Sequence, residues 1–338
     1  MKHFILTILT LATLTANAQS KTVQLLDSIA HRFTFSGYAQ AGWEYHQHKE
    51  PNNEFKVNRI IVMSNLRITN RLSAFAMLEF KAFSLHELWV NYEIRPWLRV
   101  KFGQFKTPFS IENPLSPSLL ETVPQLSMAT SHMVAGGSQL MMPGSAGRDI
   151  GLTVYGDAGK YLSYDLAIMN GAGRNKTDDN AHKDFSARLT LHAMPQLDIS
   201  ASTIIGKGRA EKLDSALRVT VDPTLSHRDF TRNRFAVGAY LRTTPFDLRA
   251  EWMWGKNGQA KSNGGYVTAL AKNIAVKGLD LIGSYDYLRD NSLSTNRFQA
   301  GIQYWFFRKC RVQLGYSYSK TDHQNGENAV LTQLQVGF

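Results

Sequence analysis

The stretch from Cys310 to Phe338 constrains the fold most, because its apolar residues recur at every second position. Val312 and Leu314 alternate with polar or small residues, and the same pattern returns after a polar turn. A period of two predicts β-strands with one apolar face and one polar face. The polar positions carry glutamine, serine and arginine, which suit water. Strands that are apolar on one side and polar on the other are typical of a β-barrel that crosses a lipid bilayer.

The beginning of the chain has the three parts of a secretory signal peptide. These are the positive Lys2, an apolar core, and Ala16-Asn17-Ala18 as a cleavage site. We therefore expect residues 1–18 to be a leader and residues 19–338 to form one exported barrel domain. No later apolar run is long enough for a helical span. The single cysteine, Cys310, excludes an intrachain disulfide.

The charge balance is basic, with 38 Lys and Arg against 27 Asp and Glu, a formal net charge of +11. Such a surplus fits nucleic acid, an anionic lipid surface or anionic solutes. The export signal argues against nucleic acid as a partner. Outer-membrane lipid and small anionic or hydrophilic solutes remain as the expected partners.

Alternation along the whole chain predicts sixteen strands, an even number as in bacterial single-chain barrels. Short connections are expected on one side of the barrel and longer polar ones on the other. The segment at residues 266–276 fits least well, and its register is undecided from sequence. Aromatic residues such as Trp252, Trp254 and Tyr316 gather toward strand ends, which favours the two aromatic girdles of a membrane barrel over a soluble sandwich. The predicted fold class is all-β, a transmembrane antiparallel barrel.

Between the fifth and sixth strands the alternation stops over residues 107–147. This stretch contains five prolines, the pair Gly136-Gly137, and apolar residues such as Leu115 and Leu120 that do not suit open water. A loop of this length without regular structure usually has a function. Because a sixteen-stranded barrel leaves an aqueous channel, we expect this third long connection to fold inward and narrow it.

Three segments resemble the phosphate-selective porin O and P family. These are Gly103-Gln104-Phe105-Lys106-Thr107-Pro108-Phe109-Ser110, Arg148-Asp149-Ile150-Gly151-Leu152 and Phe35-Ser36-Gly37-Tyr38. The resemblance implies a homotrimeric channel in the bacterial outer membrane, with an inward-folded third loop and a preference for anions such as phosphate. We expect passive diffusion through the channel, and no catalysis or cofactor. The alternatives are a porin that is general or specific for another solute and lacks anion selectivity, and an enzyme built on a barrel.

Strand parity directs both basic and acidic side chains into the lumen. Planar guanidinium groups suit phosphate, although arginines beside carboxylates also form ordinary ion pairs in a barrel wall. No catalytic or metal residues are predicted: His46 and His48 lack a third ligand, and Ser131 and His132 lack a third catalytic partner. The pore-lining candidates are Arg59, Arg67, Arg99, Lys101, Arg188, Arg249 and Arg311.

Overall fold

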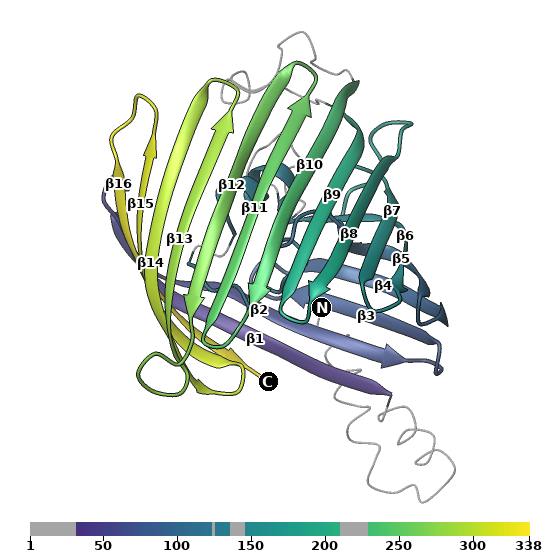
Figure 1. Ribbon diagram of the computed structural model, residues 1–338, viewed down its shortest axis with the longest axis horizontal. Helices are drawn as coiled ribbons and strands as arrows, with labels where there is room; N and C mark the ends of the chain where they lie inside the picture. Colours follow the sequence, from purple (N-terminus) through teal and green to yellow (C-terminus); the bar gives the residue numbers. More distant parts are fainter. Residues whose placement is uncertain (1–31, 124–125, 136–145, 210–228) are drawn as a thin grey trace, which may run out of the picture.

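The computed structural model describes residues 32–123, 126–135, 146–209 and 229–338. Within these ranges sixteen antiparallel strands form a closed barrel, each bonded to its neighbours in sequence, and the first pairs with the last (Figure 1). The strands are β1 Phe33–His46, β2 Asn53–Arg67, β3 Leu72–Glu79, β4 Ser84–Arg95, β5 Leu98–Lys106, β6 Arg148–Ala158, β7 Leu162–Met169, β8 Asp184–Met194, β9 Leu197–Arg209, β10 Asp229–Arg242, β11 Phe246–Asn257, β12 Ala260–Ala271, β13 Leu279–Asp290, β14 Leu293–Phe307, β15 Cys310–Thr321 and β16 Glu327–Gly337. The predicted fold class and strand number are confirmed. The leader expected over residues 1–18 lies outside the described residues.

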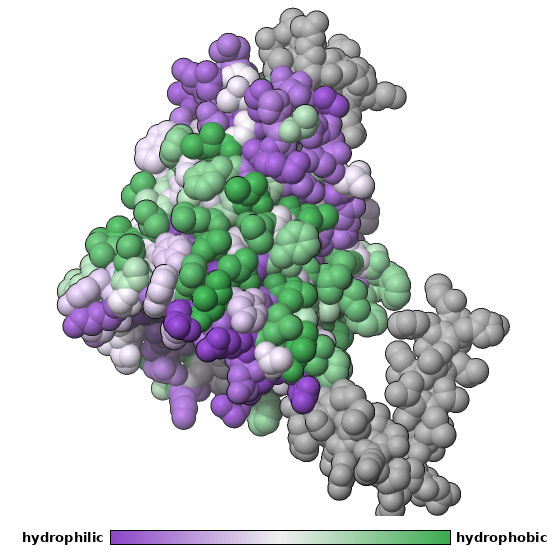
Figure 2. Space-filling view, turned by 90° about the vertical axis from the view of Figure 1, so that its right-hand side faces the viewer, coloured by the Kyte–Doolittle hydropathy of each residue, from purple (hydrophilic) through white to green (hydrophobic). Residues whose placement is uncertain are grey.

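The two faces of the barrel follow the alternation in the sequence. On β15, Val312, Leu314 and Tyr316 are exposed on the outside, whereas Arg311 and Gln313 are 0% and 2% exposed on the inside. Figure 2 shows a belt of hydrophobic residues across the middle of one side of the barrel, with hydrophilic residues gathered above it. A belt of this kind matches the apolar band of an outer-membrane barrel. Among the described residues, no helix is long and apolar enough to span a membrane.

Aromatic side chains on the outer face interact across strands. The rings of Trp252 and Tyr287 stack with their centroids 5.9 Å apart. They lie on β11 and β13, and Gly265 on the intervening β12 is in register with both. The missing side chain of Gly265 leaves the space in which the two rings meet. Tyr285 packs against Phe298 in the same region, with centroids 4.8 Å apart.

The C-terminal residue closes the barrel between β1 and β16. The amide of Phe338 donates to the carbonyl of Gly37 at 3.0 Å, and the amide of Gly37 donates back at 3.3 Å. The Lys309 ammonium also donates to the Phe338 carbonyl at 3.0 Å. The last residue therefore belongs to the hydrogen-bonded wall.

The expected division into short and long connections is wrong at three places. On the side with the short turns, β12 and β13 are joined by residues 272–278. β11 and β12 are joined by residues 258–259, and β13 and β14 by residues 291–292, although both connections lie on the side with the longer loops. The strand placed at residues 266–276 is β12, which runs from Ala260 to Ala271. Its first half lacks an apolar outer row, and Tyr266 points inward, where it is buried. The sequence alternation could not set the register here, because the first half of β12 has no row of apolar residues on its outer face.

Candidate functional site

The loop between β5 and β6 enters the barrel and packs against the inner wall. Phe109 is completely buried and joins Met133 of the same loop in a cluster with Ile204 and Met253 of β9 and β11. The Ser110 amide donates to the Ser202 hydroxyl at 3.0 Å. These contacts remove apolar residues of the loop from water, as expected for a segment with many apolar residues outside the strands.

Two short helical turns lie in the second half of this loop, α3 at Met128–Thr130 and η2 at Ser131–Ala135. Ser127 caps the first, because its hydroxyl accepts a hydrogen bond from the Thr130 amide at 3.1 Å. Figure 1 shows these turns inside the ring of strands. The loop therefore fills part of the lumen.

Charged groups fasten the loop to β11. The Glu251 carboxylate accepts from the Ser110 hydroxyl at 2.6 Å and from the Ile111 amide at 3.0 Å. Arg249 donates to both carboxylate oxygens of Glu121, at 3.2 Å and 2.8 Å. A second carboxylate, that of Glu112, lies 3.5 Å from Arg249. Burial raises the pKa of the Glu112 carboxyl, while the positive charge of Arg249 acts in the opposite direction.

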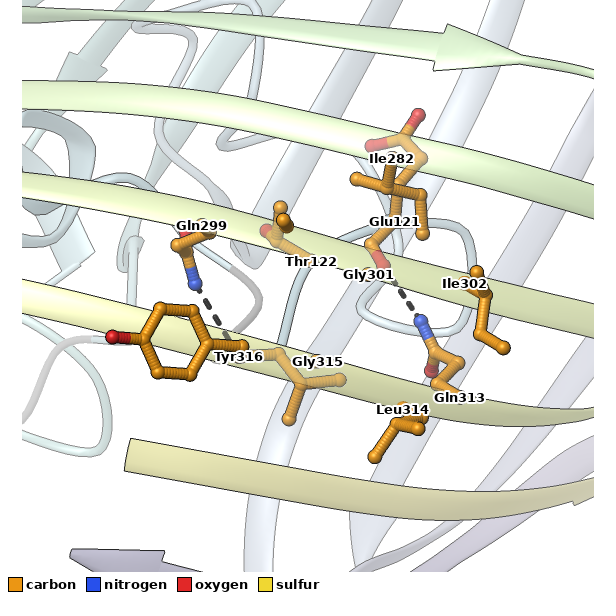
Figure 3. A pocket seen from close by; sticks show the side chains of 12 residues that line it. Glu121, Thr122, Ile282, Gln299, Gly301, Ile302, Gln313, Leu314, Gly315 and Tyr316 are labelled. Atoms are coloured by element: carbon orange, nitrogen blue, oxygen red, sulfur yellow. Dashed lines mark hydrogen bonds between the residues drawn. The ribbon is translucent and has the colours of Figure 1, made fainter. Parts of the chain in front are cut away.

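The middle of the loop lies on β14 and β15. Gln313 donates to the Glu121 carbonyl at 2.7 Å, and Gln299 donates to the Val123 carbonyl at 3.3 Å. Figure 3 shows Glu121 and Thr122 over the neighbouring glycines Gly301 and Gly315. The gap that remains there is only about 10 Å³, about the space of one water molecule. The loop therefore covers this part of the inner wall.

The open part of the lumen lies between the loop and the wall formed by β2, β3 and β4. It is a cavity of about 750 Å³. Glu79 is the only acidic residue that lines it in the described part of the chain. The six basic residues of the lining are Arg59, Lys81, Lys106, Arg148, Arg174 and Arg297, and we call them the basic wall. The charged residues of the lining are thus mostly cationic.

Three members of the basic wall are held by fixed partners. Arg148 forms a salt bridge with Glu87, with its Nε atom 3.0 Å from Oε1. Lys106 donates to the carbonyls of Asn113 and Leu115 in the loop, at 2.7 Å and 2.6 Å. Arg297 is paired with Asp286 on the neighbouring strand. Both of these partners of the Lys106 ammonium are backbone carbonyls, and it forms no salt bridge within the described residues.

Arg59 and Arg174 form no salt bridge within the described ranges. The buried Nε atom of Arg59 has no hydrogen-bond partner among those residues. Arg174 is on the β7–β8 loop, which is fastened to β5 by hydrogen bonds between Gln104 and Asn175 in both directions, at 2.7 Å and 2.9 Å. Burial, and then the charge of Arg148, lower the pKa of the Arg174 guanidinium. Guanidinium groups remain protonated in proteins, so both side chains present positive charge that a solute anion could neutralise.

Another part of the same cavity lining is apolar. It is formed by loop residues, namely Leu115, Pro117, Leu120, Leu126 and Met128, and we call them the apolar face. Leu115, Leu126 and Met128 are only partly buried. The lining of the cavity therefore combines cationic and apolar side chains.

The seven pore-lining candidates predicted from the sequence lie in different parts of the structure. Arg59 lines the main cavity. Arg99 and Arg188 line another cavity, of about 120 Å³, beside Tyr155 and Asp165. Lys101 lies over the rings of Trp89 and Tyr155, 4.8 Å and 4.7 Å from their centroids.

The other three candidates line neither of these two cavities. Arg249 and Arg311 are covered by the loop, and Arg311 donates to the Leu120 carbonyl at 2.8 Å. Arg67 is exposed at the end of β2.

Sequence reasoning missed most of the basic wall. Lys106 and Arg148 stand opposite each other in the ladder between β5 and β6, at the two ends of the loop. Both residues belong to the sequence segments that resemble the phosphate-selective porins. Their place in those segments could have marked them as pore-lining candidates. Arg174 and Lys81 lie in connections, where strand parity gives no direction.

The histidines of the sequence search have ordinary surroundings. His46 lies 3.6 Å from Glu44 and 3.3 Å from Glu327, and His48 contacts the Gly326 carbonyl. No group of three or more metal-ligating side chains is assembled in the described residues. His132 lies 3.7 Å from Asp290. Burial, with the charge of Arg234, lowers the pKa of His132 to about 4, so its ring is neutral at pH 7.

Comparison with known proteins agrees with this architecture. A family model described as Gram-negative porin matches residues 6–338. No significant match is found among the curated protein sequences.

Solved structures of outer-membrane proteins have similar folds. The anion-selective porin from Comamonas acidovorans has a TM-score of 0.66 at 11% identity, covering 90% of this chain and 99% of its own. The trimer form of OmpT, an outer membrane protein of Vibrio cholerae, gives 0.65 at 12% identity, with 90% and 99% covered. Salmonella typhi OmpF gives 0.62 at 13% identity, with 90% and 97% covered.

Proposed function

Because the chain belongs to the Gram-negative porin family and lies in the bacterial outer membrane, we propose that it is an anion-preferring porin. It forms a water-filled channel through which small hydrophilic solutes diffuse passively. The leader at residues 1–18 is removed on export, and residues 19–338 form the channel. The loop at residues 107–147 forms the constriction.

The observation that carries the anion preference is the composition of the basic wall. Six cationic residues and one acidic residue line the main cavity, and Arg59 and Arg174 have no salt bridge within the described ranges. In a narrow passage with low-dielectric walls, uncompensated charge attracts counter-ions and repels ions of the same sign. Anions should therefore enter more readily than cations of similar size.

Two similarities support this proposal. One structural neighbour is an anion-selective porin. The three sequence segments resemble phosphate-selective porins, and the planar fork of an arginine can bind two phosphate oxygens together. Phosphate is therefore one of the anions to be tested. The trimer form of OmpT supports a homotrimer, and outer-membrane lipid would surround it.

Planar-bilayer recording with the folded protein tests the proposal. In a KCl gradient the reversal potential should have the sign of a chloride-preferring channel. Replacing both free guanidinium groups, as Arg59→Gln with Arg174→Gln, should move that potential toward zero. Arg242→Gln, at an exposed position near the end of β10, is the matched control and should change it little. A potential near zero or of opposite sign in the wild type would indicate a general or cation-preferring pore.

Replacing chloride by phosphate then tests the finer preference. A phosphate current comparable to or above the chloride current would favour phosphate as a transported anion. A current reduced in proportion to the lower mobility of phosphate in water would leave anion preference without phosphate selectivity.

A further inference from the structure

The apolar face adds a hydrophobic surface to the cationic lining of the cavity. Other apolar residues of the loop, such as Phe109 and Met133, are fully buried against the barrel wall. Leu115, Leu126 and Met128 instead remain partly exposed to the cavity. Apolar surface left in contact with a polar space commonly marks a binding surface. These side chains therefore need an explanation beyond the packing of the loop.

Two cations of the basic wall hold the backbone of the apolar face directly. The Lys106 ammonium donates to the Leu115 carbonyl at 2.6 Å. The Arg297 guanidinium donates to the Leu126 carbonyl at 3.0 Å. Because these bonds place charge and apolar side chains next to each other in one cavity, a single solute can contact both.

We propose that the channel prefers organic anions that carry a charged head and an apolar chain or ring, such as small monocarboxylates. This inference rests on the anion preference proposed above and specifies the class of anion. The carboxylate would lie toward Arg59 and Arg174, and the alkyl chain would lie along Leu115, Leu126 and Met128. The volume of about 750 Å³ is within the usual range for small-molecule sites.

The physical reason lies in how the two walls treat different anions. A hydrated inorganic anion gains charge attraction from the basic wall but nothing from the apolar face. An alkyl carboxylate gains both, because each methylene removed from water adds about 0.8 kcal/mol when fully buried, or roughly four-fold in affinity. Partial contact over several methylenes should still give on the order of ten-fold tighter binding of hexanoate than of acetate.

Single-channel recording with the full-length folded protein tests this inference. Acetate, butyrate, hexanoate and phosphate are added in turn to KCl, and the apparent dissociation constant is obtained from the block of the chloride current. In the wild type we expect affinity to rise with chain length, with phosphate near acetate. Leu115→Ser and Met128→Gln should each weaken the dependence on chain length. Measuring both variants guards against the failure of either one to fold.

Leu119→Ser provides the matched control, because Leu119 is in the same loop and 59% exposed but does not line the cavity. It should leave the chain-length dependence intact. Equal affinity for acetate and hexanoate in an anion-preferring wild type would overturn this inference alone. A cation-preferring wild type would overturn the proposed function, and this inference with it.

Discussion

Arg249 on β11 donates from both terminal nitrogens to the carboxylate of Glu121, 128 residues away in the β5–β6 loop, at 3.2 Å and 2.8 Å. Arg249 is 2% exposed, so neither water nor salt screens this pair effectively. A second carboxylate of the loop, Glu112, lies close to the same guanidinium. One strand residue thus fixes two points of the loop inside the barrel.

Removing the guanidinium should destabilise the protein strongly. Arg249→Leu leaves Glu121 and Glu112 buried without a cation, and we expect the free energy of unfolding to fall by about 3–5 kcal/mol. Urea unfolding in lipid vesicles measures this loss. Arg242→Leu is the control, because Arg242 pairs with Asp198 where water reaches both, and it should cost less than about 1 kcal/mol. Similar small losses for both variants would show that the Arg249 pair does not anchor the loop.

Stability should depend on pH through Glu112. Its pKa is raised by burial, so the folded protein binds the proton more tightly than the unfolded chain. Below the ordinary carboxyl pKa of 4.5, Glu112 is protonated in both states and its burial as a charge costs nothing. As the pH rises toward the higher pKa of the folded state, the free energy of unfolding of the wild type falls. Glu112→Gln keeps an acceptor for the Ser127 amide and removes this cost. Relative to the wild type, the variant should be more stable at about pH 8 than at about pH 4; a difference independent of pH would contradict this.

The outward face of β15 can be tested with a charge. Leu314→Arg places a guanidinium against lipid and should lower the free energy of unfolding by about 2–4 kcal/mol if the residue lies near the bilayer centre. The adjacent Gln313 is not a neutral comparison, because it is buried beneath the loop and bonded to Glu121. Asn58 lines the main cavity and donates to Gln333 at 2.9 Å, and Asn58→Arg should cost less than Leu314→Arg because water reaches the cavity. If Asn58→Arg proved the more damaging, the assigned faces would be wrong.

The last residue should matter for assembly. Deleting Phe338 removes its backbone bonds with Gly37 and the acceptor for Lys309, which weakens the closure between β1 and β16. We expect a smaller folded, heat-modifiable fraction in outer membranes, measured by gel mobility with and without heating. Phe338→Leu keeps the backbone and should retain most of that fraction. An unchanged yield after the deletion would mean that closure does not need this residue.

Alternation was enough to predict the barrel because most strands have lipid on one side and water on the other. It failed at Tyr266, whose ring faces inward and whose hydroxyl donates to Glu251 at 3.2 Å beneath the loop. There the inner wall is dry, so an aromatic residue is suitable inside. Prediction from strand parity assumes that the inner face of every strand contacts water. Where the loop covers the inner wall, that assumption does not hold.

Strand parity also could not predict which of the inward-facing residues line the main cavity. Parity directed Arg249 and Arg311 inward correctly, but it could not show that the loop would cover them. Arg174 lines the cavity from the β7–β8 loop, where the neighbouring Asn175 is bonded to Gln104, 71 residues away in the sequence. Contacts of this kind depend on the folded path of two loops, and no local pattern encodes them.

The central claim is that the β5–β6 loop narrows the lumen and leaves a passage lined by the basic wall. The most direct test is to replace residues 115–140 with a short Gly-Ser link and record single channels in a KCl gradient. The loop contacts with Arg311 and Gln313 would be lost, while the strands remain paired. We predict a higher conductance and a reversal potential closer to zero. A folded variant with unchanged conductance and reversal potential would contradict the account.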